Sequence, residues 1–341
     1  MVKRVALVTC QDANGLGPDD RRLITALGER GIEAEAVVWN DPAVDWNSYD
    51  LSVVRSTWDY PRHVKEFVKW AQSVPHLAND AKVIEWNTDR RYLKQLRDAG
   101  VPVVDTIWLD PEAHLSKRAI HSRMPAFGDF VVKPVVGANA EDVGRYQPIS
   151  AESRAKAISH AQRLLDSGRW VMIQPYITSI DTQGETCLTF INDEFQHAVR
   201  RKALLGGSHR QTVGLSLYAE EGMQSVAITD EQLAVAKQAI AAAHKASGSS
   251  EPFLYARVDL VNGDGTPSSA SARITAPTTP QFEGPLVVEI ELTDPALWLR
   301  HSLKNTTLPH FADAIAERLE VAPDSDKDVH ASRIAARLRK Y

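Results

Sequence analysis

The sequence predicts an α/β protein made of α+β lobes, and three observations favour this fold class. Residues 1–86 alternate short apolar runs with helical segments, which is typical of an open sheet flanked by helices. Residues 186–201 have the pattern of a β-hairpin, and two more strands are expected between 254 and 292, so a second, antiparallel sheet is predicted. The 341 residues exceed one comfortable hydrophobic core, which predicts two or three lobes.

The first lobe, residues 1–86, is predicted to be an open α/β sheet that contacts substrate. Its strands are expected at 5–8, 34–39 and 51–55, with a helix at 21–30. Ligands of open α/β sheets bind beyond the carboxyl ends of the strands. The candidate substrate residues are the polar ones found there: Thr9, Asp12, Arg55, Ser56, Thr57 and Asp59. Arg55 suits a carboxylate and Asp59 an amine, as in an amino-acid-like ligand, and a structural ion pair is the alternative.

The rest of the chain divides into a central lobe at 87–180, a C-terminal lobe at 181–310 and a helical tail at 311–341. A helix is expected at 88–99, with Thr88 as its N-cap and Gly100 after its end. Thr229 and Gln232 form the capping-box pattern of a later helix. The remaining expected segments are a strand-like stretch at 101–109, strands at 130–133 and 170–174, a helix at 150–165 and a long loop at 262–285.

Charge and composition exclude several classes of function. The formal net charge of −5, with Lys and Arg spread along the chain, argues against a nucleic-acid or anionic-membrane partner. The apolar runs are far shorter than a membrane span, and the N-terminus has the pattern of a strand, not of a secretory signal. The two cysteines, Cys10 and Cys187, are too few for a disulfide framework or a zinc site. We therefore expect a cytoplasmic, reduced protein.

Two predicted strands carry acidic residues on one face. Glu289 and Glu291 alternate with apolar residues, so they project from the same side of their strand, opposite Val288. Arg257 and Asp259 share a face of the preceding strand in the same way. If the two strands pair, Asp259, Glu289 and Glu291 converge, and three hard oxygen ligands suit magnesium. The alternative is an exposed sheet face of alternating charge.

Three further segments suit nucleotide phosphates and a purine. Lys133 ends an apolar strand and precedes a loop of small residues, Gly137 and Asn139 among them, whose backbone could meet phosphate oxygens; a solvated lysine is the alternative. The strand at 170–174 breaks at Gln174-Pro175, and this break suits a hinge whose polar groups meet a purine edge. A buried strand that ends in a proline turn is the alternative. A basic strand at 200–202, placing Arg200 and Lys202 on one face, precedes Arg210 and could neutralise a transferred phosphoryl group; a charged edge strand is the alternative.

The order of these elements resembles the ATP-grasp superfamily: a lysine-ended strand, a hinge, a basic strand, then Asp and Glu-x-Glu. The resemblance covers nearly the whole chain, to about residue 303, and the segment Val-Glu-Ile-Glu-Leu-Thr-Asp-Pro resembles the magnesium strand of glutathione synthetase-like members. Residues 55–60 and 87–93 resemble a bacterial branch that includes the cyclo-ligase closing the D-cycloserine ring. The implied fold has an N-terminal pre-ATP-grasp domain, a small lid and a C-terminal antiparallel-sheet domain.

The resemblance implies ATP and Mg²⁺ as cofactors and a role for each candidate residue. Lys133 would bind phosphate, Gln174, Pro175, Tyr176 and Ile177 would hold adenine, and Glu185 would hold the ribose. Lys202 and Arg210 would contact phosphates or an acyl phosphate, alongside Arg257, and Asp259, Glu289 and Glu291 would bind magnesium. The implied activity is ADP-forming carboxylate–amine ligation of a small amino-acid-like substrate. Dimers are common in this family, so a homodimer is an alternative to a monomer.

Two departures from the family pattern and two rival functions stay open. Arg90 stands where the family usually has a second phosphate-binding lysine, and the 262–285 segment is longer than usual. Cys187 is expected to be a buried structural cysteine, with no role as a nucleophile. The rival functions are a small-molecule kinase on the same scaffold and a non-catalytic nucleotide-binding regulator.

Overall fold

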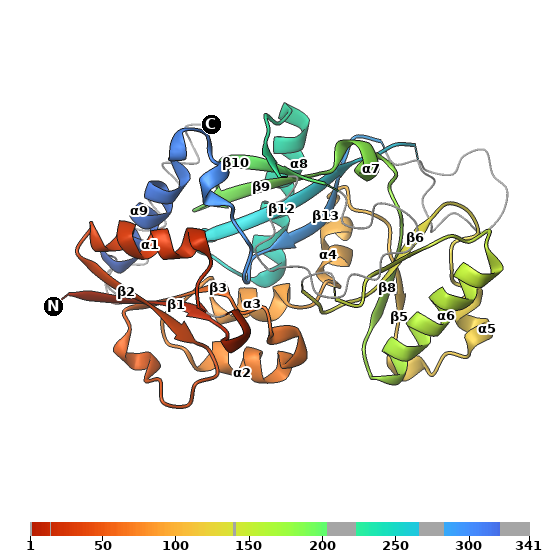
Figure 1. The fold of residues 1–341 in the computed structure, drawn as a ribbon, viewed down its shortest axis with the longest axis horizontal. Helices are drawn as coiled ribbons and strands as arrows, with labels where there is room; N and C mark the ends of the chain where they lie inside the picture. Colours follow the sequence, from red (N-terminus) through yellow and green to blue (C-terminus); the bar gives the residue numbers. More distant parts are fainter. Residues whose placement is uncertain (1, 14, 139–140, 203–222, 266–282, 321–341) are drawn as a thin grey trace.

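The part of the chain that the structure describes forms three β-sheets, each with its own helices (Figure 1). The computed structural model describes residues 2–13, 15–138, 141–202, 223–265 and 283–320. Most of the predicted helical tail at 311–341, most of the predicted loop at 262–285, and the sites Asn139 and Arg210 lie outside these residues. No helix within the described ranges combines the length and apolar character needed to span a bilayer.

The N-terminal sheet is parallel and has the strand order β2-β1-β3-β4. Its apolar strands are buried because helices cover both faces, as the βαβ pattern of the sequence predicts. The strands are β1 (Lys3–Thr9), β2 (Ile32–Val38), β3 (Leu51–Ser56) and β4 (Leu77–Ala78), and the helices are α1 (Pro18–Gly28), α2 (Val64–Ser73) and α3 (Ala81–Asn87).

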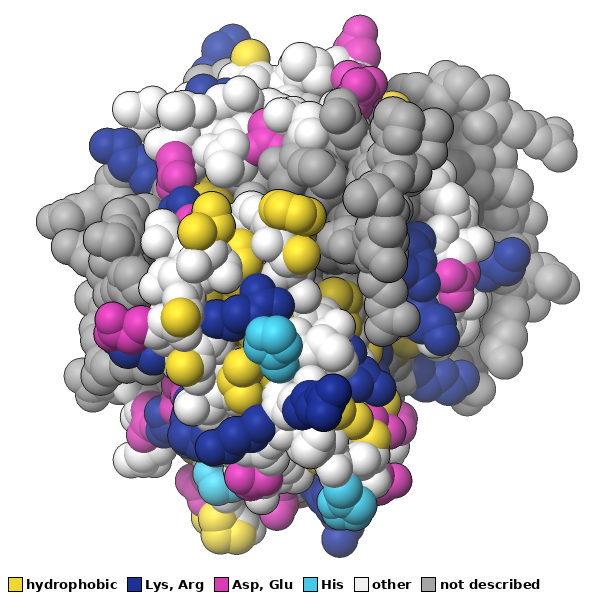
Figure 2. Space-filling model, turned by 90° about the vertical axis from the view of Figure 1, so that its right-hand side faces the viewer, with side chains coloured by type: hydrophobic (Ala, Val, Ile, Leu, Met, Phe, Trp, Pro, Cys, Tyr) yellow, Lys and Arg dark blue, Asp and Glu magenta, His cyan; other side chains and the backbone are white. Residues whose placement is uncertain are grey.

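The lid is a small antiparallel sheet with the order β5-β8-β6-β7 and two helices against it. Its strands are β5 (Ile107–Leu109), β6 (Phe130–Pro134), β7 (Gly144–Tyr146) and β8 (Val171–Pro175), and its helices are α5 (Lys117–His121) and α6 (Ala151–Asp166). The lid faces the viewer in Figure 2, where basic side chains gather on its outer surface. Lys117, Arg118 and Arg123 are exposed, and so are the apolar Phe127 and Ile149, so the solvent side of the lid is mixed in character.

The C-terminal sheet is antiparallel and has the order β11-β10-β9-β12-β13. Its strands are β9 (Glu185–Ile191), β10 (Glu194–Arg201), β11 (Gln224–Ser225), β12 (Tyr255–Asn262) and β13 (Pro285–Glu291). The helices are α7 (Ser179–Gln183), α8 (Asp230–Ser247) and α9 (Thr307–Glu320). The predicted hairpin between β9 and β10, the pairing of β12 with β13, and the capping box of Thr229 and Gln232 are confirmed.

The segment between the first two sheets differs from the sequence prediction. Thr88 is not an N-cap, because it follows α3 and its N–H bonds back to the Ile84 carbonyl; α4 (Tyr92–Asp98) begins only at Tyr92. Of the strand predicted at 101–109, only β5 is a strand of the lid, and Val103 forms an isolated bridge to Val287. The apolar face of α4 packs on α8, so tertiary contacts place this segment with the C-terminal sheet.

A buried histidine joins the C-terminal sheet to the chain that follows β13. His197 on β10 contacts the Thr307 hydroxyl through Nδ1 at 3.0 Å and the Leu297 carbonyl through Nε2 at 3.0 Å. Burial lowers the pKa of His197 from 6.5 to about 4. Because the folded pKa lies below the unfolded value, the stability that neutral His197 contributes is present above pH 6.5 and is lost as the pH falls towards 4.

The first prediction follows from this histidine. We expect the free energy of unfolding to fall between pH 6.5 and 4, and His197→Asn to flatten part of that slope while costing about 1 kcal/mol at neutral pH through its lost hydrogen bond. Urea unfolding at several pH values measures both effects, with the exposed His114→Gln as the control. An unchanged slope in His197→Asn would contradict the assignment.

Candidate active site

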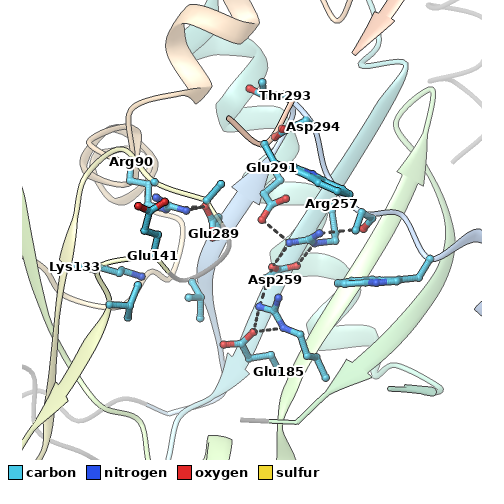
Figure 3. A pocket seen from close by; sticks show the side chains of 18 of the residues that line it. Arg90, Lys133, Glu141, Glu185, Arg257, Asp259, Glu289, Glu291, Thr293 and Asp294 are labelled. Atoms are coloured by element: carbon cyan, nitrogen blue, oxygen red, sulfur yellow. Dashed lines mark hydrogen bonds and ion pairs between the residues drawn. The ribbon is translucent and has the colours of Figure 1, made fainter. Parts of the chain in front are cut away.

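A cleft of about 530 Å³ lies between the lid and the C-terminal sheet and extends to the N-terminal domain. All three lobes contribute to its lining, with Arg55 and Tyr60 from the first, Lys133 from the lid and Asp259 from the C-terminal sheet. Figure 3 shows that charged side chains from these elements point towards one another. The cleft is therefore the candidate active site.

The three predicted carboxylates converge in this cleft. One oxygen each from Asp259, Glu289 and Glu291 lies within 4.8 Å of the other two. Antiparallel pairing sets Asp259 opposite Glu289 and Arg257 opposite Glu291, so the alternating faces of β12 and β13 coincide. Burial and the neighbouring charges of Glu289 and Asp259 raise the pKa of Glu291 to about 8, despite the opposing effect of Arg257. Three hard oxygen donors that repel one another fit a divalent cation such as Mg²⁺.

The predicted orientation of Val288 is wrong. The pairing of β12 and β13 shifts between Asp259 and Leu260, so the partner of Leu260 is Val287 and Val288 is the extra residue of a bulge. Val288 consequently lines the cleft beside Glu289 instead of facing the opposite side. Strict two-residue alternation fails at a bulge, and the sequence carries no signal for this one.

Arg257 neutralises part of the carboxylate cluster. Its Nε and Nη2 atoms donate to the two oxygens of Asp259 at 2.8 and 2.9 Å, and Nη2 also lies 2.5 Å from a Glu291 oxygen. The guanidinium lies over the Trp298 ring, 4.6 Å from its centre. Burial raises the pKa of Asp259, but the Arg257 charge and hydrogen bonds outweigh it and leave that pKa below its usual value. Arg257 is thus held by the cluster.

Arg90 and Lys133 make the positive end of the cleft. Arg90 donates from Nε to Glu289 at 2.7 Å, so the arginine at the family's lysine position reaches the same carboxylate cluster. Burial, and next the charge of Arg90, lowers the pKa of Lys133 to about 8. Gly137 lies beside them, and a Cβ built there would come within 3.7 Å of an Arg90 nitrogen. This crowded positive region suits phosphate oxygens.

The basic strand reaches the cleft at Lys202, as predicted, and also at Arg201. Arg201 and Lys202 line the cleft, whereas Arg200 is exposed and does not. Arg201 pairs with Glu185, directly opposite it on β9, and lies 3.8 Å from Asp259. The chain leaves the strand at Lys202, so the predicted sharing of one face by Arg200 and Lys202 does not hold.

The hinge residues and a set of apolar residues form the other end. Gln174, Pro175, Tyr176 and Ile177 all line the cleft, and Gln174 donates to the Thr106 hydroxyl at 2.9 Å. Apolar residues that sequence analysis did not assign to a site line the same region: Val104, Val131, Ile180, Val261 and Val288. Val131 and Val261 could have been found, because each lies two residues from a predicted ligand on its own strand. This end suits a flat aromatic ring.

The structure brings only one of the six predicted substrate residues to the cleft wall. Arg55 lines the cleft, but its Nε donates to Asp20 and its Nη2 to the Pro295 carbonyl. Thr9 and Ser56 are buried and share a hydrogen bond of 2.9 Å, so they join β1 to β3. Thr57 reaches the cleft only indirectly, through its hydrogen bond to Asp294.

The two acidic members of that set also lie away from the cleft lining. Asp12 pairs with the exposed Arg62 at 3.5 Å, and Asp59 accepts a hydrogen bond from the Trp39 ring nitrogen. The rule that ligands bind beyond the carboxyl ends of the strands indicated the edge of the sheet that borders the cleft. It did not indicate which side chains face the cleft. Asp294, in the segment after β13, lines the cleft and was not singled out by sequence analysis. The sequence offers only its nearness to Glu291 as a signal.

Cys187 is buried, as predicted, on β9 between the Glu185 and Asp259 side chains. Burial and the Asp259 charge raise its pKa well above the usual value. A thiol in this state is a poor nucleophile, which agrees with the structural role expected of it.

Comparison with known proteins decides the family. Residues 5–79 match the family described as the N-terminal domain of D-cycloserine synthetase DcsG. Over 325 residues, the chain is 34% identical to the cycloserine biosynthesis protein DcsG of Streptomyces lavendulae, covering 93% of this chain and 99% of that protein. The chain belongs to the D-cycloserine synthetase family of ATP-grasp ligases.

Solved structures agree with this assignment to the D-cycloserine synthetase family. The crystal structure of D-cycloserine synthetase DcsG matches with a TM-score of 0.78 and 33% identity, over 93% of this chain and 99% of that one. D-alanine–D-alanine ligase from Bacillus anthracis, solved with ATP, matches with a TM-score of 0.58 and 16% identity, over 93% of this chain and 97% of that one, which shows the shared fold. The family member described here is thus an ADP-forming ligase with the predicted ATP-grasp fold.

Proposed function

We propose that this ligase joins a carboxylate to an amine through an acyl phosphate, on an amino-acid-like substrate. The observation that carries the proposal is the convergence of Asp259, Glu289 and Glu291 in the cleft that Lys133 also lines. Several acidic residues can bind one divalent ion only where their side chains converge, and an ATP site needs cations that face the phosphates. Both conditions hold in one cleft.

The geometry supports a position for ATP between the lid and the C-terminal sheet. The hinge at 174–177 and the apolar residues beside it would hold adenine, and Glu185 would hold the ribose. Lys133 and Arg90 would contact phosphate oxygens, with Gly137 allowing their close approach. Asp259, Glu289 and Glu291 would hold Mg²⁺, which when bound neutralises phosphate charge. Asn139 stays a predicted phosphate contact outside the described residues.

The residues around this position would each serve the transfer of the γ-phosphoryl group to the substrate carboxylate. Lys202 and Lys133 would offset the charge that spreads over the phosphoryl oxygens, and Arg210 stays a predicted contributor outside the described residues. Arg257 would orient the acceptor carboxylate beside the metal ligands. An amine then attacks the acyl carbon, phosphate leaves, and an amide forms. The enclosed cleft would protect the acyl phosphate from water.

The relatives favour an amino-acid-like substrate, because the matched proteins are named for the biosynthesis of cycloserine. We propose that the present ligase acts on a substrate of this class, with the attacking amine supplied either by the same molecule, as in ring closure, or by a second one. The sequence identity of 34% supports the class and not one compound.

The second prediction tests this reaction. Incubation with ATP, Mg²⁺ and hydroxylamine is expected to give a hydroxamate from the accepted carboxylate, together with ADP, because hydroxylamine intercepts an acyl phosphate. A panel of amino acids is assayed for phosphate release and hydroxamate, with an ATP-free reaction as the control. Release of a stable phosphate ester without hydroxamate would favour the kinase alternative, and no ADP with any member of a broad panel would favour a nucleotide-binding regulator.

A further inference from the structure

Most charged side chains that line the cleft have their charge neutralised within the protein. Arg90 pairs with Glu289, Arg257 with Asp259 and Glu291, and Arg201 with Glu185, while the ion pairs nearer the N-terminal domain are Arg55–Asp20 and Arg300–Asp19. Among the described lining residues, the exceptions are two cations, Lys133 and Lys202, and one carboxylate, Asp294, for which no oppositely charged side chain lies within ion-pair distance. The proposed phosphates explain why the two lysines lack a partner within the protein. The proposed ATP site offers no such explanation for Asp294.

Asp294 is hydrogen-bonded to the N-terminal domain. The Thr57 hydroxyl donates to its Oδ2 at 3.1 Å, and Arg55 holds the adjoining Pro295 carbonyl at 3.1 Å. Arg55 is itself buried and fixed by Asp20 at 2.8 Å. The polar cluster at the end of β3 thus positions Asp294, although most of its members do not face the cleft.

Asp294 is charged at neutral pH and has no ion-pair partner among the described residues. Burial raises its pKa to about 6 against the opposing effects of the Thr57 hydrogen bond and of the Arg55 and Arg257 charges, so the carboxylate is mostly ionised at neutral pH. A half-buried anion without an ion-pair partner is unfavourable unless a ligand supplies the cation.

The location of Asp294 suits one end of a short substrate. It lies beyond Glu291 in Figure 3, on the side of the carboxylate cluster away from Lys133. Asp294 follows Glu291 by three residues, so the Cα atoms of the two are at most about 10 Å apart. Both residues line the same cleft, where a small substrate with its carboxylate at the proposed metal site would have its amino group on the Asp294 side.

We propose that Asp294 binds the cationic amino group of the substrate, and that it makes the ligase select an amino acid over the corresponding simple carboxylic acid. This inference rests on the proposed ligase function, because it assumes that the substrate carboxylate lies beside the metal ion that Asp259, Glu289 and Glu291 would hold. Asp294 is a specificity-determining residue in this scheme and takes no part in binding ATP.

The third prediction uses Asp294→Asn, which keeps the shape and the Thr57 hydrogen bond but removes the charge. Each accepted amino acid is assayed for phosphate release beside the analogue that has hydrogen in place of the amino group. The variant is expected to lose about 10²-fold or more in kcat/KM for the amino acid, because the ammonium loses its partner. The value for the analogue and the KM for ATP stay within about 3-fold of wild type, since neither depends on that charge.

Two matched variants exclude a general structural effect. Asp294→Glu keeps the charge and is expected to retain a preference for the amino acid, whereas Asp98→Asn, an exposed change of the same charge, should behave as wild type. If Asp294→Asn keeps the full preference, or loses activity equally on both members of each pair, the inference is overturned.

A binding experiment separates failure of this inference from failure of the ligase proposal. If wild type forms no hydroxamate from any carboxylate, the ligase proposal fails, and amino-acid affinity is then measured by calorimetry with a non-hydrolysable ATP analogue present. Weaker binding to Asp294→Asn than to wild type would still support the amino-group site. Equal affinities, or no amino-acid binding by wild type, would overturn it.

Discussion

Glu289→Gln is expected to lower the rate of ADP formation by about 10²–10³-fold, the loss typical of removing one charged group that stabilises a transition state. The substitution keeps the size of the side chain but removes one of the three converging negative charges. It also removes the carboxylate partner of Arg90, whose Nε lies 2.7 Å from Glu289. Arg90 can then neutralise phosphate charge, but the metal ion has lost one of its ligands. Steady-state ADP release at saturating ATP measures the effect, and excess Mg²⁺ or Mn²⁺ should recover part of it.

Glu194→Gln is the control for this fourth prediction, because it makes the same change at an exposed position of β10 in the same sheet. Both variants should keep the thermal unfolding midpoint of the wild type to within a few degrees, since neither creates a cavity. Wild-type turnover by Glu289→Gln, with or without limiting Mg²⁺, would rule out the proposed metal site.

Arg257→Met is expected to destabilise the protein by about 3–5 kcal/mol, which is the usual cost of removing one partner from a buried ion pair. Arg257 is 3% exposed and is bonded to Asp259 and to Glu291, so its loss leaves two carboxylates without their counter-charge. Urea unfolding in the absence of divalent ions measures the free energy. Added Mg²⁺ should stabilise the variant more than the wild type, because the ion takes over the role of the guanidinium.

Two further variants test this fifth prediction. Arg97→Met removes an exposed arginine whose 3.7 Å pair with Asp98 is expected to contribute less than about 1 kcal/mol. The double variant Arg257→Met with Asp259→Asn should be less destabilised than the sum of its parts, because the two residues share one interaction. Additive losses, or a loss near that of Arg97→Met, would contradict the proposed charge balance.

Much of the fold was predictable because local patterns and strand pairing agree. The alternation of apolar and polar residues predicted β12 and β13, and it also placed Asp259 and Glu289 on the polar faces of their strands, which coincide when the strands pair. The errors fall where local patterns conflict with packing. Thr88 has the chemistry of an N-cap, yet it follows the end of α3, a helix that was not predicted and whose Val83 and Ile84 pack into two different hydrophobic clusters.

The substrate side of the cleft was less predictable, and the reason is the distance along the chain between its parts. Thr57 contacts Asp294 across 237 residues, and Arg90 contacts Glu289 across 199. No periodicity in a single segment reports such contacts, because they depend on how the three sheets pack. The sequence indicated β3's polar end as important, but not that it supports Asp294.

The amino-acid sequence by itself determined which residue types could hold a nucleotide and a metal, and on which face of each strand most of them lie. Side-chain alternation is a property of extended backbone, so it can be read without knowing the fold. Only the tertiary structure decided which of these charges meet, through the bulge at Val288, the pairing of Arg201 with Glu185 and the position of Asp294 in the cleft. Ion pairing acts over a few ångströms in space, and distances of that kind arise only when separate sheets pack together.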